Sequence, residues 1–160
     1  MEALVSDLHD VTNGRLRELV DAGGYQQEHW WRPEDWQWVQ ADGVTHPLFW
    51  ERHGDWWQWR GMFDLVPLPP SWPVYVSLAE ATAFARWQGA RLPTEAEFQR
   101  AAYGSPDGGE RRHPWGDDSP SVRHGVFDFS SWDPEPAGRH PDTALALPAG
   151  QCGLWPRGPA

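Results

Sequence analysis

The chain has 160 residues, which is the usual size of one domain. Its 13 basic residues are all arginine and stand against 23 acidic residues, so the formal net charge at neutral pH is −10. This balance argues against a nucleic-acid-binding face and against attraction to anionic lipid. Cys152 is the only cysteine, which excludes an intramolecular disulfide and a multi-cysteine metal site.

The composition is unusual in its tryptophan, glycine and proline content. There are 13 tryptophans, 16 glycines and 16 prolines, and eight of the tryptophans lie between Trp30 and Trp59. So much glycine and proline predicts a largely irregular backbone, whereas so many aromatic residues argue against disorder. No apolar run approaches the ~18 residues of a membrane span, and Met1 opens no signal peptide. We therefore expect a cytoplasmic protein.

The first predicted element is a helix near the N-terminus. Leu16 and Leu19 are three positions apart and share one helical face. Thr12 or Asn13 can cap this helix by accepting a hydrogen bond from a free backbone amide. Gly23-Gly24 supplies a left-handed stop.

A short helix and a hairpin are predicted in the tryptophan-rich stretch. Pro33 suits the first turn of a helix. Trp57 and Trp59 alternate with polar residues, which is typical of a strand, and a turn near His53–Asp55 would join it to a preceding strand. Pro67–Pro70 must be extended, because proline fixes φ and lacks an amide hydrogen.

Residues 74–104 carry the clearest local signals. A short strand is predicted over Val74–Val76. Ser77 with Glu80, and Thr94 with Glu97, each form the pattern of a capping box, in which two side chains satisfy each other's backbone amides. Each box predicts a helix start, and Gly89 and Gly104 supply the stops. The expected apolar faces are Leu78, Ala81, Phe84 and Ala85 in the first helix, and Phe98, Ala101 and Ala102 in the second.

Residues 105–160 predict little regular structure beyond a short strand over Val126–Phe129. The seven histidines include no pair three or four positions apart, so no single helix can present two of them to one metal ion. The tryptophans have two interpretations. Stacked rings can bind sugars, cations or quaternary ammonium groups, but filling the core of an irregular fold is the favoured interpretation, because 13 tryptophans cannot all line one pocket.

Three segments together resemble the formylglycine-generating-enzyme (sulfatase-modifying factor) domain family. They are Val11–Gly14 with Ala22–Tyr25, then Arg91–Phe98, then His113–Asp117. Within that family the chain is most similar to the C-terminal domain of iron-dependent sulfoxide synthases of the ergothioneine type, over residues 8–142. The residues that match family motifs, which we interpret as structural, are Asn13, Arg91, Leu92, Pro93, Thr94, Glu95, Glu97, Pro114, Trp115, Gly116 and Asp117.

The resemblance implies an α+β fold related to C-type lectins, with small twisted sheets and little regular secondary structure. It also implies that residues 1–143 form a partial domain that is incomplete at its C-terminus, because the family's Gly-Asn-x-Trp-Glu-Trp segment is absent from a chain whose only asparagine is Asn13. Residues 144–160 are then expected to be a disordered or aberrant tail.

The resemblance also implies a reaction: oxygen-dependent C–S bond formation between a thiol and a histidine-derived betaine on non-haem iron. In such synthases the iron ligands belong to a separate helical domain with an HxxxH pattern, which this sequence does not contain. We therefore assign no catalytic residue, metal ligand or cofactor to this chain, expect it to be inactive alone, and expect a separately encoded iron-binding helical partner. Two alternatives are a non-catalytic lectin-like module that binds a small molecule or a protein, and a formylglycine-generating oxidase acting on sulfatases.

Overall fold

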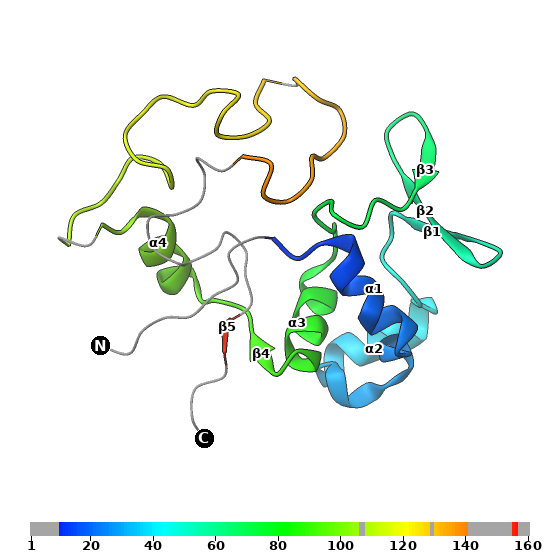
Figure 1. Ribbon diagram of the computed structural model, residues 1–160. Helices are drawn as coiled ribbons and strands as arrows, with labels where there is room; N and C mark the ends of the chain where they lie inside the picture. The colour runs from blue at the N-terminus through cyan, green and yellow to red at the C-terminus, as the bar shows by residue number, and fades with distance from the viewer. Residues whose placement is uncertain (1–9, 106–107, 129, 141–154, 157–160) are drawn as a thin grey trace.

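Short helices and strands alternate with long irregular segments in this protein (Figure 1). The computed structural model describes residues 10–105, 108–128, 130–140 and 155–156. Within these residues the elements are α1 (Asn13–Asp21), the 3-10 helices η1 (Gly24–Gln26) and η2 (Glu28–Trp30), α2 (Pro33–Asp42), β1 (Trp50–His53), β2 (Trp56–Arg60), β3 (Leu65–Pro67), α3 (Leu78–Trp87), β4 (Ala90–Arg91), α4 (Glu95–Tyr103) and β5 (Trp155–Pro156).

Helix α1 begins and ends at the predicted residues. The Thr12 hydroxyl accepts a hydrogen bond from the backbone amide of Arg15, so Thr12 is the N-cap. Gly23 follows the last turn with a φ of 71°, the left-handed conformation that glycine adopts without strain. Leu16 and Leu19 are buried on the inner face, which confirms the predicted helix.

Both capping boxes are present, and each starts a helix. Ser77 and Glu80 exchange hydrogen bonds at the start of α3, and Thr94 and Glu97 do so at the start of α4. The predicted apolar face of α3 is wrong at its first residue, because Leu78 is 66% exposed. The helix packs against α1 and η2, and these neighbours cover the face that carries Ala83 and Phe84 rather than the one that carries Leu78.

Strands β1, β2 and β3 form one antiparallel sheet with tryptophan on its buried face. Trp50 lies opposite Trp59 in the β1–β2 register, and the turn between the two strands contains Gly54 with a φ of 60°. Trp57 and Trp59 are buried, while Trp56 is 71% exposed, so the predicted alternation and hairpin are confirmed. The sequence did not predict β3, which occupies the edge of the sheet, where a proline is tolerated.

Two predicted strands are wrong. Residues 74–76 form no strand, and Pro73 makes only an isolated bridge to Thr12. The pairing cannot extend into a ladder, because α1 begins at Asn13, directly after Thr12. Of the strand predicted over Val126–Phe129, residues 126–128 form no strand either, and Phe129 lies outside the described residues. Asp128 has a φ of 54°, which breaks the extended conformation.

The core is built of two neighbouring clusters of buried side chains. The larger one joins the inner face of α1, the tryptophans of the sheet and Phe84 of α3. The smaller one joins Tyr25, Trp31, Val39 and Ala83, which come from η1, the residue after η2, α2 and α3. Aromatic rings therefore supply much of the apolar burial that the few short helices cannot supply.

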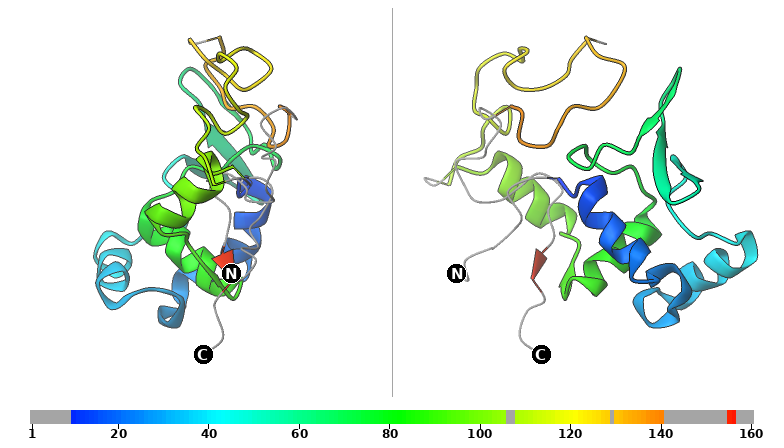
Figure 2. Two further views of the ribbon diagram at one scale, coloured as in Figure 1. Left: turned by 90° about the vertical axis from the view of Figure 1, so that its left-hand side faces the viewer. Right: turned by 45° about the vertical axis from the view of Figure 1, so that its right-hand side comes forward.

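A long irregular segment leaves α4 and crosses to the other side of the molecule. In Figures 1 and 2 residues 108–128 and 130–140 arch over the helices toward the loop that follows β3. The backbone amide of Ala137 donates to the carbonyl of Ser71 at 2.8 Å, which joins the far end of the segment to that loop. No helix in the described part of the chain combines the length and the apolarity that crossing a membrane requires.

The predicted tail contains one described element. Strand β5 lies within residues 144–160 and pairs antiparallel with β4, so that Ala90 lies opposite Pro156. The other residues of that range lie outside the described part of the chain. The predicted domain boundary at residue 143 therefore stays a prediction.

Candidate functional site

The end of α2, the loop over residues 43–49 and the segment leading into α3 enclose a cavity of about 570 Å³. We call it the aromatic cavity. Its walls include three aromatic side chains, one histidine and two carboxyl groups within the described residues, and no arginine. The side chains that carry the argument are Trp38, Phe49, Tyr75, His46, Asp42 and Glu80.

The aromatic walls are held by ring contacts. Phe49 and Tyr75 meet edge to face with their ring centroids 6.0 Å apart, and both remain partly exposed at the opening. The His46 ring lies 5.0 Å from Trp57, which fixes the cavity to the buried face of β2. Aromatic faces that line a cavity in this way attract cations through the ring quadrupole.

Glu80 is the buried polar group of this site. It is 4% exposed, and its Oε1 accepts a hydrogen bond of 2.7 Å from the Tyr25 hydroxyl. Its Oε2 accepts hydrogen bonds from the backbone amide and the hydroxyl of Ser77, both at 2.8 Å. Burial, and then the neighbouring Glu80 charge, raise the pKa of the Tyr25 phenol, so the phenol keeps its proton and donates it to the hydrogen bond.

The cavity therefore offers aromatic faces together with carboxyl groups. Asp42 is exposed at the rim, while Glu80 is fixed in the wall. Because its walls hold no arginine within the described residues, this combination suits an organic cation better than an anion.

Asn13, the first of the family-motif residues, lies at the centre of the fold and not in the cavity. It is completely buried. Its Nδ2 donates to the carbonyl of Pro69 at 2.9 Å, and its Oδ1 accepts from the indole of Trp50 at 3.3 Å. Its side chain thus joins α1 to the sheet and to the proline-rich segment.

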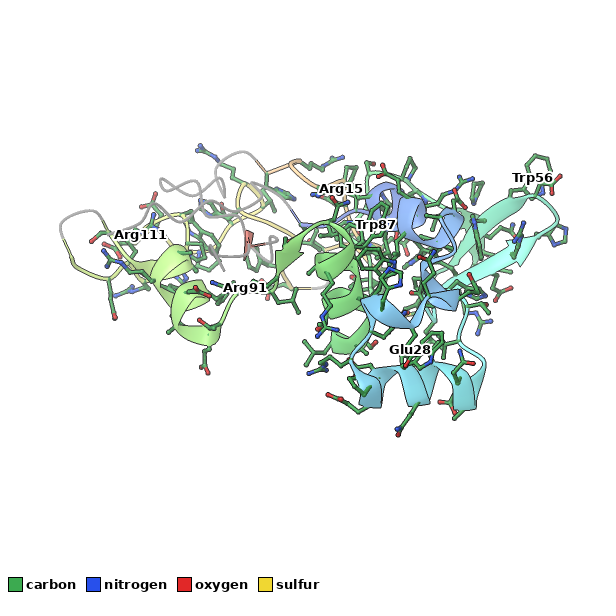
Figure 3. The ribbon with its side chains drawn as sticks, turned by 90° about the horizontal axis from the view of Figure 1, so that it is seen from below. Arg15, Glu28, Trp56, Trp87, Arg91 and Arg111 are labelled. Atoms are coloured by element: carbon green, nitrogen blue, oxygen red, sulfur yellow. The ribbon has the colours of Figure 1, made fainter. Side chains whose placement is uncertain are left out.

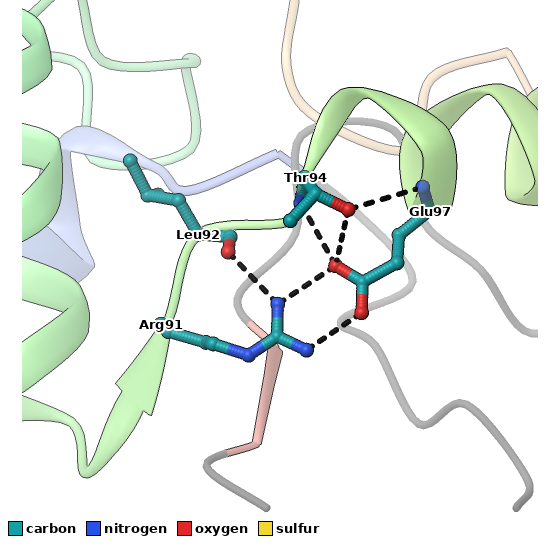
Figure 4. A network of polar contacts seen from close by, with 4 residues as sticks. All are labelled: Arg91, Leu92, Thr94 and Glu97. Atoms are coloured by element: carbon teal, nitrogen blue, oxygen red, sulfur yellow. Dashed lines mark hydrogen bonds and ion pairs between the residues drawn. The ribbon is translucent and has the colours of Figure 1, made fainter.

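The Arg91–Glu97 motif forms one polar network at the start of α4 (Figure 4). Arg91 donates to both carboxylate oxygens of Glu97, at 2.7 and 2.6 Å, and Nη1 also donates to the Leu92 carbonyl. The Arg91 guanidinium, followed by the Thr94 amide, lowers the pKa of Glu97 to about 2. Glu95 is exposed in the first turn of the helix.

Two residues of this motif line a second cavity. Leu92 and Pro93 border an apolar cavity of about 440 Å³ together with Phe98. Tyr75 lies in the walls of both this cavity and the aromatic cavity. The motif therefore forms part of the wall of an apolar cavity that adjoins the aromatic cavity at Tyr75.

The third motif is a tight turn in the long irregular segment. Pro114 and Trp115 occupy the turn, and His113 and Gly116 exchange backbone hydrogen bonds of 2.8 and 2.9 Å across it. Asp117 follows the turn, and its Oδ1 accepts a hydrogen bond from a backbone amide on the other arm at 3.0 Å.

The indole ring of Trp115 in this turn stacks on two histidine rings. Trp115 stacks on His113 and on His124, with ring centroids 4.9 and 4.6 Å apart. The three family motifs therefore lie at three separate places, and none of their residues lines the aromatic cavity. Their structural role stays a prediction.

An iron site does not fit the described residues. No group of three or more His, Cys, Asp or Glu side chains within them could hold a metal ion. The rings of His113 and His124 each stack on Trp115, and the ring of His46 contacts Trp57.

Sequence reasoning did not find the aromatic cavity. Glu80 was explained by its capping box alone, and Tyr25 only by the Gly-Gly-Tyr segment of the family resemblance. Their positions are 55 residues apart, and neither shows a local pattern that names the other. No local pattern predicted that Phe49 and Tyr75 meet, because their contact is a product of the fold.

Comparison with known proteins gives the same family as the motifs. A family model described as the sulfatase-modifying factor enzyme 1-like domain matches residues 2–152. The hercynine oxygenases of Mycobacterium tuberculosis and Mycolicibacterium smegmatis are each 40% identical to the chain over 144 residues, which are 88% of this chain and 33% of each relative. The formylglycine-generating enzyme of Streptomyces coelicolor is 36% identical over 120 residues, 68% of this chain and 38% of that protein.

The chain spans about one third of the length of the hercynine oxygenases it matches. Its mixture of short helices and a small antiparallel sheet agrees with the α+β fold expected from the motifs. The chain belongs to the sulfatase-modifying factor enzyme 1-like domain family.

Proposed function

We propose that this chain is a domain of an ergothioneine-type hercynine oxygenase, which joins hercynine to a thiol in an oxygen-dependent reaction. The observation that carries the proposal is the 40% identity to hercynine oxygenases over 88% of the chain. The similarity to a formylglycine-generating enzyme covers less of the chain at lower identity. The oxygenase is therefore favoured over the oxidase that acts on sulfatases.

The aromatic cavity supports a role for the domain in holding the substrate. Hercynine is a histidine-derived betaine, so it carries a quaternary ammonium group that cannot donate a hydrogen bond. Such a group is recognised by aromatic faces and nearby negative charge. Trp38, Phe49 and Tyr75 supply the rings, and Asp42 and Glu80 supply the carboxyl groups. We assign the binding of the ammonium group to these side chains.

The iron of the proposed reaction is not assigned to this domain, because the described residues hold no suitable group of ligands. We propose that a separate iron-binding helical domain with an HxxxH pattern supplies the metal. In this arrangement the present chain contributes the substrate cavity, and it has no turnover without that partner.

Isothermal titration of the full 160-residue chain with hercynine tests the substrate assignment. Histidine, which lacks the three methyl groups, is the matched control ligand. We expect saturable binding of hercynine and binding of histidine weaker by about tenfold or more, because the primary ammonium of histidine is strongly hydrated and loses more hydrogen bonds to water than the quaternary ammonium does when it enters an aromatic cavity.

A pair of phenylalanine variants locates the binding. Phe49→Leu removes a ring from the cavity wall, and Phe63→Leu removes an exposed ring that contacts Trp132 elsewhere. We expect Phe49→Leu to weaken hercynine binding by about three- to tenfold and Phe63→Leu to leave it unchanged. Equal affinities for hercynine and histidine, or equal effects of the two variants, would refute the cavity assignment.

Reconstitution tests the partner. The chain is co-expressed with a neighbouring reading frame that encodes an HxxxH helix, and iron content and sulfoxide product are measured. We expect the two chains to elute together, to retain iron and to convert hercynine and a thiol in the presence of oxygen. Co-elution with iron but without product would contradict the proposed reaction.

A further inference from the structure

The C-terminal end of α4 and the chain that follows it enclose a polar cavity of about 400 Å³. It shares no lining residue with the aromatic cavity. In Figure 3 the labelled Arg111 marks this place, at the end of α4 that lies away from Arg91. The cavity is thus separate from the site described above and from the Arg91–Glu97 network.

Two guanidinium groups meet at one glycine in this cavity. Arg111 donates from Nη2 to the carbonyl of Gly104 at 3.1 Å and to the carbonyl of Ala102 at 3.4 Å. Arg100 packs against the same glycine, because a Cβ added to Gly104 would lie 2.9 Å from its Nη1. Only glycine leaves room for this approach.

Three other arginines have carboxylate partners that these two lack among the described residues. Arg32, Arg60 and Arg91 each pair with a carboxylate. Within the described residues, neither Arg100 nor Arg111 forms an ion pair, and the Nε of Arg111 is buried without a hydrogen-bond partner. The two neighbouring guanidinium groups leave positive charge at the cavity that a bound negative group would neutralise.

Glu110 gives the cavity a distinctive electrostatic feature. It lines the cavity, and its backbone bridges to Gly104, yet its carboxylate forms no ion pair with Arg100 or Arg111 among the described contacts. An anion bound between the arginines would feel repulsion from this carboxylate. The repulsion provides a signature that a merely structural pair of arginines would not produce.

We propose that this cavity binds the oxyanion group, a carboxylate or a phosphate, of a small molecule. The planar guanidinium fork matches both groups and forms charge-assisted hydrogen bonds with them. The unpaired guanidinium of Arg100 and the lining guanidinium of Arg111 supply the contacts, and the volume of the cavity leaves space for the body of the ligand. This site is independent of the proposed oxygenase function.

Titration of the full chain with inorganic phosphate and with succinate, in buffer of low ionic strength, tests the proposal. Three charge variants are compared: Arg100→Gln in the cavity, Arg86→Gln on α3 as the matched control, and Glu110→Gln. Arg100 is exposed and holds no described polar partner, so its replacement leaves the fold intact. Circular dichroism confirms this for each variant.

We expect saturable binding of at least one of the two anions. Arg100→Gln should weaken it by about tenfold or more, Arg86→Gln should leave it unchanged, and Glu110→Gln should tighten it. Preference for phosphate or for succinate identifies the ligand class. The proposal would be overturned if neither anion bound saturably. It would also be overturned if Arg100→Gln and Arg86→Gln weakened binding equally, because the binding would then depend only on the overall charge of the protein surface.

Discussion

The hydroxyl of Tyr25 donates a 2.7 Å hydrogen bond to Oε1 of Glu80, joining η1 to the first turn of α3 across 55 positions of the sequence. The same glutamate caps α3 through Ser77 and lines the aromatic cavity. One buried carboxyl group therefore has three tasks: it starts a helix, fixes two elements to each other and gives the cavity an acidic wall.

Tyr25→Phe tests this relationship directly. The variant keeps the ring in the smaller core cluster but leaves Glu80 without one of its donors in a buried place. We expect the free energy of unfolding to fall by about 1–3 kcal/mol, measured by urea denaturation. Tyr75→Phe, at a half-exposed tyrosine, is the control and should change it by less than about 0.5 kcal/mol. Equal changes in the two variants would show that the buried hydrogen bond adds no more to the free energy of unfolding than an exposed hydroxyl does.

Asn13→Ala should be among the most destabilising polar substitutions in the chain. It leaves the Trp50 indole and the Pro69 carbonyl without their buried partner. We expect a loss of about 2–4 kcal/mol in the free energy of unfolding. Gln99→Ala, at an exposed position of α4, is the control and should be nearly neutral. A neutral Asn13→Ala would mean that water replaces both contacts.

Glu97 makes stability depend on pH in the acid range. Its pKa falls from 4.5 in the unfolded chain to about 2 beside Arg91. A lowered pKa stabilises the fold above the unfolded value, and this contribution is lost as the pH falls from about 5 toward 2. Denaturation at successive pH values should show this loss in the parent and in Glu95→Gln, but a smaller one in Glu97→Gln. Identical pH profiles for all three proteins would contradict the prediction.

Gly24 is required by close packing against α1. A Cβ at this position would lie 2.1 Å from Cδ1 of Leu19 and 2.6 Å from its Cγ, and Leu19 is itself buried. We expect Gly24→Ala to destabilise the fold by about 1–3 kcal/mol through overpacking. In a Leu19→Ala background the same change should cost less, because the two closest obstructing atoms, Cδ1 and Cγ, are gone, and only the backbone carbonyl oxygen at 3.0 Å remains. Additive effects in the double variant would exclude this overlap as the cause.

The outcome of the sequence predictions follows the range of the interactions involved. The capping boxes at Ser77 and Thr94 were predictable, because each is complete within four residues. The strand expected over Val74–Val76 was wrong, because a strand needs a partner, and the available partner turns into α1. Strand β3 was not predicted, because a three-residue edge strand that contains proline has almost no local sequence pattern and depends on its pairing with β2.

The sequence by itself determined the family, the helix starts and the alternation of tryptophans in β2, since motifs and caps are read along the chain. Only the tertiary structure decided that Tyr25 meets Glu80, that Phe49 meets Tyr75 and that Arg100 and Arg111 both approach Gly104. The first two contacts join residues far apart in the sequence, and the third depends on how the chain turns after α4. Such positions follow from the packing of the whole fold, which no local pattern encodes.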